Sequence, residues 1–189
     1  MYTLSFAAMN LNRCWHVSEN AQLLRFINND QYFSKFTDKC PNGWKDFEDS
    51  CYLHVKTTKS FKAAEEDCRR KDSSILVINS KEEERFIKND VVGKLPKDTR
   101  VWLGLRLTFT DIADFYGGRK VVWKLLDSNE EVTYNNMDPS FDNALSQHHW
   151  GQRHYAGEFC ATMIIDERLW RPAYCSYEET VVCERPAAQ

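Results

Sequence analysis

Six of the seven cysteines in this chain of 189 residues are spread over the part from residue 40 onward, and their spacing limits the folds that the chain can adopt. The six are Cys40, Cys51, Cys68, Cys160, Cys175 and Cys183. Structural zinc sites usually contain cysteine pairs separated by two to four residues, and no such pair occurs among them. Dispersed cysteines in an even number favour disulfides formed in an oxidising compartment. Their spacing alone leaves fifteen pairings open.

Cys14 is left over from this set. It is either a free thiol, which is open to oxidation in a secreted protein, or one half of an intermolecular bridge. A bridge between two copies of the chain would make a covalent homodimer through the N-terminal part. A bridge to a cysteine outside this sequence is the other alternative.

The charge and hydrophobicity of the chain exclude two classes of partner. The net charge is -3 and the pI about 6.0, so no strong positive field is available to hold nucleic acid or an anionic membrane. No apolar run is long enough to span a membrane. The first ten residues lack the positively charged start of a secretory signal. If disulfides form, we therefore expect an extracellular protein, secreted or the ectodomain of a membrane protein, whose signal segment has been removed.

The chain divides into three parts. Residues 1–39 form an N-terminal extension, in which the pattern supports one short helix over residues 18–27. Residues 40–185 hold the six cysteines and the sustained hydrophobic patterns, so we expect one domain there with its own core. Residues 186–189 form a C-terminal tail. The sequence leaves open whether the extension is ordered.

The hydrophobic periodicity of the domain predicts two helices and several strands. One helix is expected over residues 58–71, where Phe61, Ala64 and Cys68 recur at helical spacing. The second begins after Ser80, which forms a capping box with Glu83. Strands are expected at 51–55, 75–78, 101–105, 121–126, 160–165 and 179–184. The result is an α+β domain. Its polar, irregular stretch 127–159 is long enough to be a functional loop.

Several short motifs occur in order along this domain. They are Cys40-Pro41 with Gly43-Trp44, Cys51-Tyr52, Phe61 with Ala64 and Cys68, Trp102-Leu103-Gly104-Leu105, Trp123, Tyr134, Cys160, Trp170, Cys175 and Cys183-Glu184. The chain from Cys40 to Glu184 thereby resembles the C-type lectin-like domain in its long form. The resemblance implies two helices flanking small antiparallel sheets and a long loop region. It also implies three disulfides, namely Cys40–Cys51, Cys68–Cys183 and Cys160–Cys175.

The resemblance raises the question of calcium. In sugar-binding members of the family, calcium is held by Glu-Pro-Asn or Gln-Pro-Asp in the long loop, by a later glutamate, and by the Asn-Asp of a Trp-Asn-Asp motif. Here the last motif is Trp170-Arg171-Pro172, and the first corresponds either to Ser146-Gln147-His148 or to Asp138-Pro139-Ser140. Glu158 keeps a matching position. Calcium needs six to eight oxygen ligands, so we expect neither calcium nor another cofactor.

The candidate ligand-binding residues lie in the long loop and beside it. They are His148, His149, Arg153, His154, Tyr155, Glu158 and Arg171. Arginine and tyrosine are common anchors of protein interfaces. The histidines and the glutamate are also zinc-ligand types, but two adjacent histidines seldom turn to one metal, so we favour a loop that faces a partner. Trp150, in the same stretch, is expected to fill the core under the loop.

Other conspicuous residues have simpler structural explanations. We expect Trp102, Trp123 and Trp170 in the core, and a group of glutamates on exposed, charged helix faces. These are Glu65, Glu66, Glu82, Glu83 and Glu84. The motifs of serine hydrolases, zinc proteases and phosphate-binding loops do not occur, so we do not expect an enzyme.

The sequence therefore predicts an extracellular, non-catalytic recognition module. We favour calcium-independent binding of a protein partner, a receptor or its ligand, through the long-loop surface. The alternative is a carbohydrate-binding lectin with an atypical or calcium-independent site. A metal-dependent enzyme is the third class, and only the histidine cluster supports it.

Overall fold

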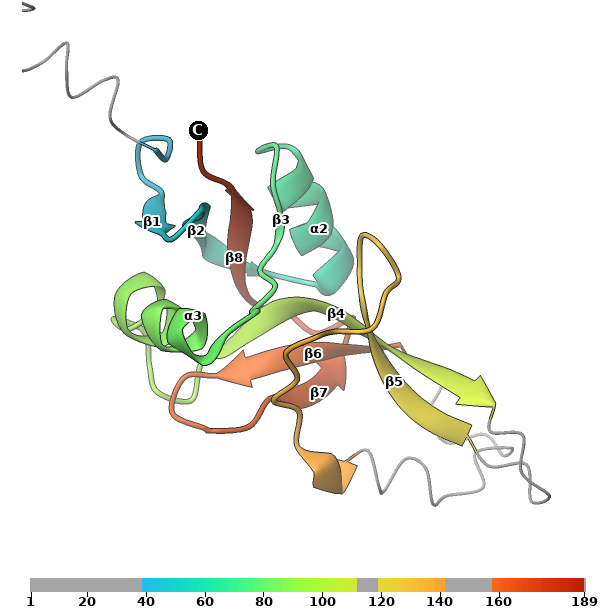
Figure 1. Cartoon of the computed structure of the whole chain (residues 1–189). Helices are drawn as coiled ribbons and strands as arrows, with labels where there is room; N and C mark the ends of the chain where they lie inside the picture. Colours follow the sequence, from blue (N-terminus) through green and yellow to red (C-terminus); the bar gives the residue numbers. More distant parts are fainter. Residues whose placement is uncertain (1–38, 112–118, 142–157, 189) are drawn as a thin grey trace, which may run out of the picture. The chain divides into compact units, whose positions relative to one another are not determined.

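The computed structural model describes residues 39–111, 119–141 and 158–188 (Figure 1). The chain from Lys39 onward forms one compact unit. Cys14 and the helix expected at 18–27 lie outside the described residues. Within the described ranges, no helix is long and apolar enough to cross a membrane.

The elements of the domain combine two short helices with strands, so the predicted α+β class is confirmed. The strands are β1 (Lys45–Phe47), β2 (Ser50–Lys59), β3 (Ser74–Ile75), β4 (Arg100–Asp111), β5 (Arg119–Leu125), β6 (Phe159–Ile164), β7 (Arg171–Tyr174) and β8 (Glu179–Pro186). The helices are α2 (Phe61–Arg69) and α3 (Lys81–Phe86), and α3 continues into a π-helical turn, η1 (Ile87–Val91).

The strands join along one path in the order β1-β2-β8-β4-β6-β7, with β3 paired to β8 and β5 paired to β4. The pairs are antiparallel except β4 and β8, which run parallel and meet at Val101 and Thr180. In Figure 1 this contact joins β1, β2, β3 and β8 on one side to β4, β5, β6 and β7 on the other. The N–H of Ala188 donates to the carbonyl of Lys39 at 2.9 Å, so the two ends of the domain lie together.

The strand expected at 75–78 is shorter than its hydrophobic run suggests. The N–H of Leu76 still donates to the carbonyl of Val182, at 3.0 Å. The next N–H, that of Val77, donates instead to the carboxylate of Glu184, at 3.1 Å. The Glu184 side chain therefore takes the place of a backbone carbonyl of β8, and the pairing of β3 with β8 ends there.

The tryptophans Trp102, Trp123 and Trp170 lie in the core, as predicted. The ring of Trp102 packs edge-on against Phe61 of α2, with 5.5 Å between ring centroids. Its indole N–H donates to the carbonyl of Lys59 at 2.8 Å. This hydrogen bond removes the penalty for burying the indole N–H, and the ring contact attaches α2 to β4.

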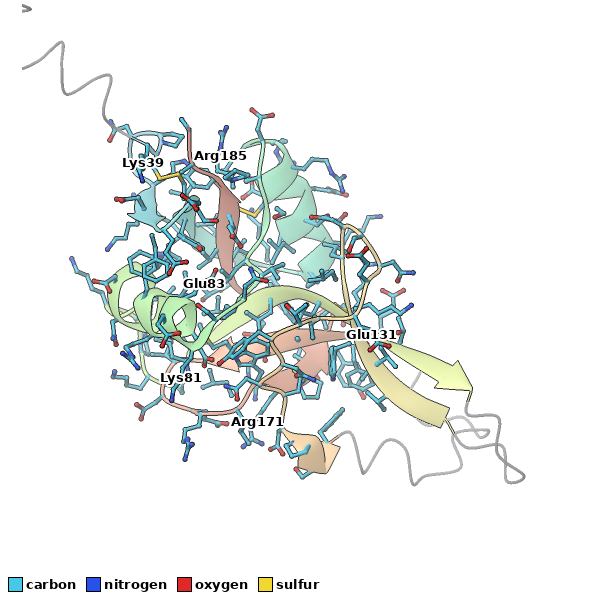
Figure 2. The ribbon with its side chains drawn as sticks, viewed as in Figure 1. Lys39, Lys81, Glu83, Glu131, Arg171 and Arg185 are labelled. Carbon is cyan, nitrogen blue, oxygen red and sulfur yellow. A yellow bond between two sulfur atoms is a disulfide. The ribbon has the colours of Figure 1, made fainter. Side chains whose placement is uncertain are left out.

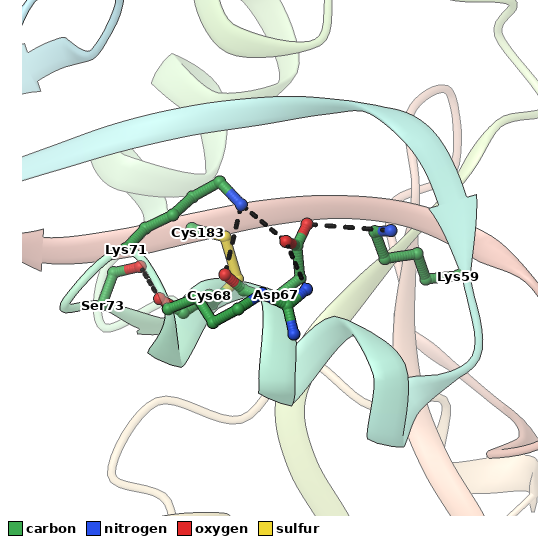
Figure 3. Close-up of a disulfide and its surroundings, with 7 residues drawn as sticks. Lys59, Asp67, Cys68, Lys71, Ser73 and Cys183 are labelled. Carbon is green, nitrogen blue, oxygen red and sulfur yellow. Dashed lines mark hydrogen bonds and ion pairs between the residues drawn. A yellow bond between two sulfur atoms is a disulfide. The ribbon is translucent and has the colours of Figure 1, made fainter.

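The three disulfides implied by the resemblance are confirmed, namely Cys40–Cys51, Cys68–Cys183 and Cys160–Cys175. The second joins α2 to β8 across 115 positions (Figure 3). Loop closure in the unfolded chain gives such a bridge a stabilising effect of about 4–5 kcal/mol. The third joins β6 to the residue that follows β7, across 15 positions. It therefore braces the strand at which the long loop ends.

A buried carboxylate reinforces the α2–β8 bridge. Asp67, next to Cys68, accepts hydrogen bonds from Lys71 at 2.7 Å and from Arg70 at 2.9 Å, and Lys59 of β2 lies 3.8 Å away (Figure 3). The hydrogen bond from Lys71 is the main reason why the pKa of Asp67 is lowered. The end of α2 is thus connected to β2 by an ion pair and to β8 by a disulfide.

Glu83 and Glu84 of α3 are buried, with exposed fractions of 5% and 6%. The prediction that they lie on an exposed helix face was therefore wrong. The hydroxyl of Ser80 accepts from the N–H of Glu83 at 3.0 Å, as in the predicted capping box. The Glu83 carboxylate, however, accepts from the N–H of Asn79 and from the hydroxyl of Tyr52, each at 2.8 Å. These hydrogen bonds offset the free-energy cost of burying the carboxylate.

Candidate functional site

The long loop reaches the described part of the chain at both of its ends. The candidate residues within 142–157 lie outside the described residues. They are His148, His149, Arg153, His154 and Tyr155, together with the expected core residue Trp150. Glu158 and Arg171 lie inside the described ranges, and both are exposed.

The first part of the loop is held against Trp170. The N–H of Trp170 donates to the carbonyl of Asn136 at 2.8 Å, and the N–H of Asp138 donates to the carbonyl of Trp170 at 2.9 Å. Met137, between these two loop residues, forms a parallel bridge with Trp170. Of the two candidates for the first calcium motif, Asp138-Pro139-Ser140 thus lies directly beside Trp170-Arg171-Pro172.

Glu84 fixes the same segment from the side of α3. Its carboxylate accepts from the hydroxyl of Tyr134 at 3.1 Å and from the side-chain amide of Asn136 at 3.2 Å. The ammonium of Lys88 lies 2.8 Å from its other oxygen. Burial, and then the charge of Glu84, raise the pKa of Tyr134 to about 12. This role was not predicted, because Glu84 looks like any charged helix residue until Tyr134 and Asn136, about 50 positions away, are known to lie beside it.

Arg171 places a fixed cation at the start of β7 (Figure 2). Its Nε donates to the carboxylate of Glu167 at 2.5 Å, and its guanidinium lies 3.9 Å from the carboxylate of Asp138. The hydrogen bond to Glu167 raises the pKa of Arg171. Asp138 also accepts from the hydroxyl of Ser140 at 2.7 Å, which lowers the pKa of Asp138.

Two of these carboxylates can be compared with the ligands that calcium requires. Calcium needs several oxygen ligands with free lone pairs that converge on one point. Asp138 and Glu167 converge instead on the guanidinium of Arg171. In the described ranges, no three residues of the types His, Cys, Asp and Glu form a group that could hold a metal. Asp138 and Glu167 are therefore paired with a side-chain cation, which competes with any metal ion for their oxygens.

A row of aromatic rings lies where the long loop rejoins the sheet. Phe141 packs against Phe159 at 5.9 Å between centroids, and Phe159 stacks on Tyr174 at 4.8 Å. Tyr174 meets Tyr177 edge-on at 5.4 Å, and Tyr177 is 54% exposed. The four rings come from three separate segments without a shared period, so no sequence pattern could have found the row.

The lectin C-type domain family model matches residues 57–185. This chain belongs to the C-type lectin domain family. The fold of that family serves non-catalytic recognition, so the prediction that this domain is not an enzyme is confirmed. The predicted family and the predicted fold are confirmed as well.

Named relatives agree with this assignment. The human C-type lectin domain family 10 member A is 29% identical over 151 residues, which are 79% of this chain and 41% of that protein. Mouse asialoglycoprotein receptor 2 is 30% identical over 156 residues, which are 82% of this chain and 45% of that protein. The chain thus spans less than half the length of these two relatives.

A solved structure gives the same result. The carbohydrate-recognition domain of the mouse scavenger receptor C-type lectin matches with 31% identity and a TM-score of 0.56. The match covers 78% of this chain and 98% of that domain. The similarity therefore extends over the whole of a separate lectin domain.

Proposed function

We propose that this domain is an extracellular recognition module that binds a protein partner, without calcium, through the long-loop surface. The observation that carries the proposal is the ion pair of Arg171 with Glu167 and Asp138. A side-chain cation neutralises carboxylates next to the Trp170-Arg171-Pro172 segment, where sugar-binding relatives have calcium ligands. A divalent cation entering there would be repelled by the guanidinium and would lose both carboxylates as ligands.

The described rim of this surface has the composition of a protein interface. The side chain of Arg171 is 47% exposed, so the guanidinium remains accessible to a partner. Tyr177 presents more than half of its surface at the end of the aromatic row. Arginine and tyrosine are enriched among residues that dominate binding energy. The same surface would be completed by Glu158 and by the loop residues His148, His149, Arg153, His154 and Tyr155.

Carbohydrate binding at the same surface is the second candidate. The similarity to a carbohydrate-recognition domain at 31% identity favours it. Sugar hydroxyls would then be bound by side chains alone, because the described ligands do not converge for calcium.

The remaining expectations belong to the same proposal. We assign recognition to residues 40–185, with residues 1–39 as an N-terminal extension and residues 186–189 as a tail. The three disulfides support an oxidising, extracellular location. If Cys14 forms a bridge between two copies of the chain, the module is a covalent homodimer.

A calcium titration with a thermal melt tests calcium independence. We expect the melting temperature of the 189-residue chain to be the same in millimolar calcium and in chelator, since a ligand that binds only the folded state would raise it. Arrays of secreted proteins and of neutral glycans, screened in chelator, then separate the two candidates. A hit must weaken in a His154→Ala, Tyr155→Ala variant and persist in a Lys56→Ala, Lys62→Ala control. Calcium-dependent capture of neutral glycans would refute the proposal.

A further inference from the structure

A concave surface lies between α3 and the connection from β6 to β7. Figure 1 shows this connection passing beside α3, and residues from both line one pocket of about 530 Å³. The volume is in the usual range for small-molecule and saccharide sites. The α3 side is lined by Lys81, Glu84, Arg85, Lys88 and Asn89, and the opposite side by Lys97, Tyr134, Asn136 and residues 165–169.

The walls of this pocket are held by hydrogen bonds from three directions. The ammonium of Lys88 donates to the carbonyl of Glu167 at 2.6 Å, and the side-chain amide of Asn136 donates to the carbonyl of Arg168 at 2.6 Å. The N–H of Asp166 donates to the carbonyl of Lys97 at 3.1 Å. The connection is therefore fixed in place before any ligand binds, which reduces the entropic cost of binding.

The charge of the pocket is positive although the chain as a whole is negative. Lys88 is neutralised by Glu84, and Glu167 is neutralised by Arg171 outside the pocket. Four exposed cations remain that have no carboxylate partner among the described residues, namely Lys81, Arg85, Lys97 and Arg168. Asp166 is the one lining carboxylate without an ion pair in those ranges. The unpaired cations outnumber it by three.

We propose that this pocket binds a sulfated glycan chain. A sulfate group accepts several hydrogen bonds at once, and the planar guanidinium groups of Arg85 and Arg168 can each donate two in parallel. The side chain of Asn89 is exposed at the edge and supplies an amide for sugar hydroxyls.

A saccharide fits this pocket better than an acidic peptide does. Protein interfaces are anchored by exposed aromatic and large apolar side chains. The aromatic lining residue, Tyr134, uses its hydroxyl on Glu84, and Leu169, at 37% exposure, is the exposed apolar residue of the lining. The site uses no residue of 142–157 and no calcium, so it is independent of the function proposed above.

Titration calorimetry on the 189-residue chain tests the proposal at an ionic strength of about 0.15 M. The probes are a heparin octasaccharide, the unsulfated octasaccharide of the same backbone, and a poly-glutamate peptide of similar length. The test variant is Arg85→Gln, Arg168→Gln. The control variant is Lys56→Gln, Lys62→Gln, which removes the same charge from exposed positions of β2 and α2.

We expect the sulfated octasaccharide to bind, and the test variant to weaken it about tenfold or more, because hydrogen bonds to charged groups are strong. The control variant should change the dissociation constant by less than about twofold. Lys56 and Lys62 do not line the pocket, and salt screens their attraction for the bound sulfates. Both variants should melt as the parent does. The proposal is overturned if the sulfated chain does not bind, if both variants weaken it equally, or if either unsulfated probe binds as tightly. Undiminished binding in the His154→Ala, Tyr155→Ala variant would separate this pocket from the long-loop site.

Discussion

Two regions of this domain each contain a buried carboxylate, but only the first also has a disulfide. Where α2 meets β2, β4 and β8, the Cys68–Cys183 bridge and the contact of Phe61 with Trp102 add a cross-link and apolar contact to the ion pairs of Asp67. Where α3 meets the start of the long loop, the buried carboxylate of Glu84 collects three donors. Apolar contacts stabilise without a preferred direction, and a disulfide stabilises mainly by constraining the unfolded chain. A buried charge stabilises only when every partner is in place. The second region therefore tolerates the loss of a single side chain less well.

The largest loss of stability is expected where the Cys68–Cys183 disulfide joins α2 to β8. The double variant Cys68→Ala, Cys183→Ala should lower the free energy of unfolding by about 4–5 kcal/mol, because a loop of 115 positions is released in the unfolded chain. Urea denaturation monitored by tryptophan fluorescence measures this loss.

The matched control is Cys160→Ala, Cys175→Ala, which opens a loop of only 15 positions. Its loss should be smaller, about 3 kcal/mol. Equal losses in the two variants would show that the cross-links do not act through the length of the loop they close.

In the polar region, Glu84→Ala should lower the free energy of unfolding by about 3 kcal/mol, because the ammonium of Lys88 is left without its carboxylate in a site where it is only 17% exposed. Glu84→Gln should lose less, since its amide oxygen still accepts from Tyr134 or Asn136. Addition of Lys88→Met to Glu84→Ala should recover part of the loss. A double variant less stable than either single variant would contradict the buried-charge account.

Glu184 should make stability depend on pH where β8 passes β3. Burial is the main reason why its pKa is raised to about 7, and the charge of Glu83 adds to the effect. The folded protein binds this proton more tightly than the unfolded chain, so the stabilising contribution is complete below about pH 4.5 and is lost as the pH rises through about 7. The change should be about 3 kcal/mol.

The Glu184→Gln variant isolates this contribution, because glutamine imitates the protonated carboxyl and still accepts from the N–H of Val77. The difference in unfolding free energy between variant and parent should grow from pH 4.5 to pH 7.5. His54 has a lowered pKa because of burial, and its effect of opposite sign is present in both proteins and cancels. A difference that does not vary with pH would exclude the raised pKa.

The smallest effect on stability is expected at Arg171. Its side chain is 47% exposed and its partner Glu167 is 40% exposed, so Arg171→Ala should change the free energy of unfolding by less than about 1 kcal/mol. The same variant should weaken binding of the partner at the long-loop surface. A large loss of stability would assign Arg171 to the scaffold instead.

The scaffold could be predicted from the sequence to a large extent. The helix containing Phe61, Ala64 and Cys68 and the burial of Trp102 follow from local spacing, because a regular hydrophobic pattern has few ways to become buried. The disulfide pairing came from the resemblance, since spacing alone leaves it undetermined. Two short strands, β1 and β7, had no such pattern and were missed.

The candidate site depended on tertiary structure. Glu84, Tyr134 and Asn136 are ordinary polar residues in the sequence, and they become a network only because the fold brings segments about 50 positions apart within hydrogen-bond distance. The same holds for Arg171 with Asp138 and for the cations Arg85 and Arg168 around one pocket. Local sequence determines which surfaces of an element turn inward, because hydrophobic burial follows the period of the chain. Which charges meet is decided by the packing of distant elements, because charge-assisted contacts need a distance and direction that no local pattern records.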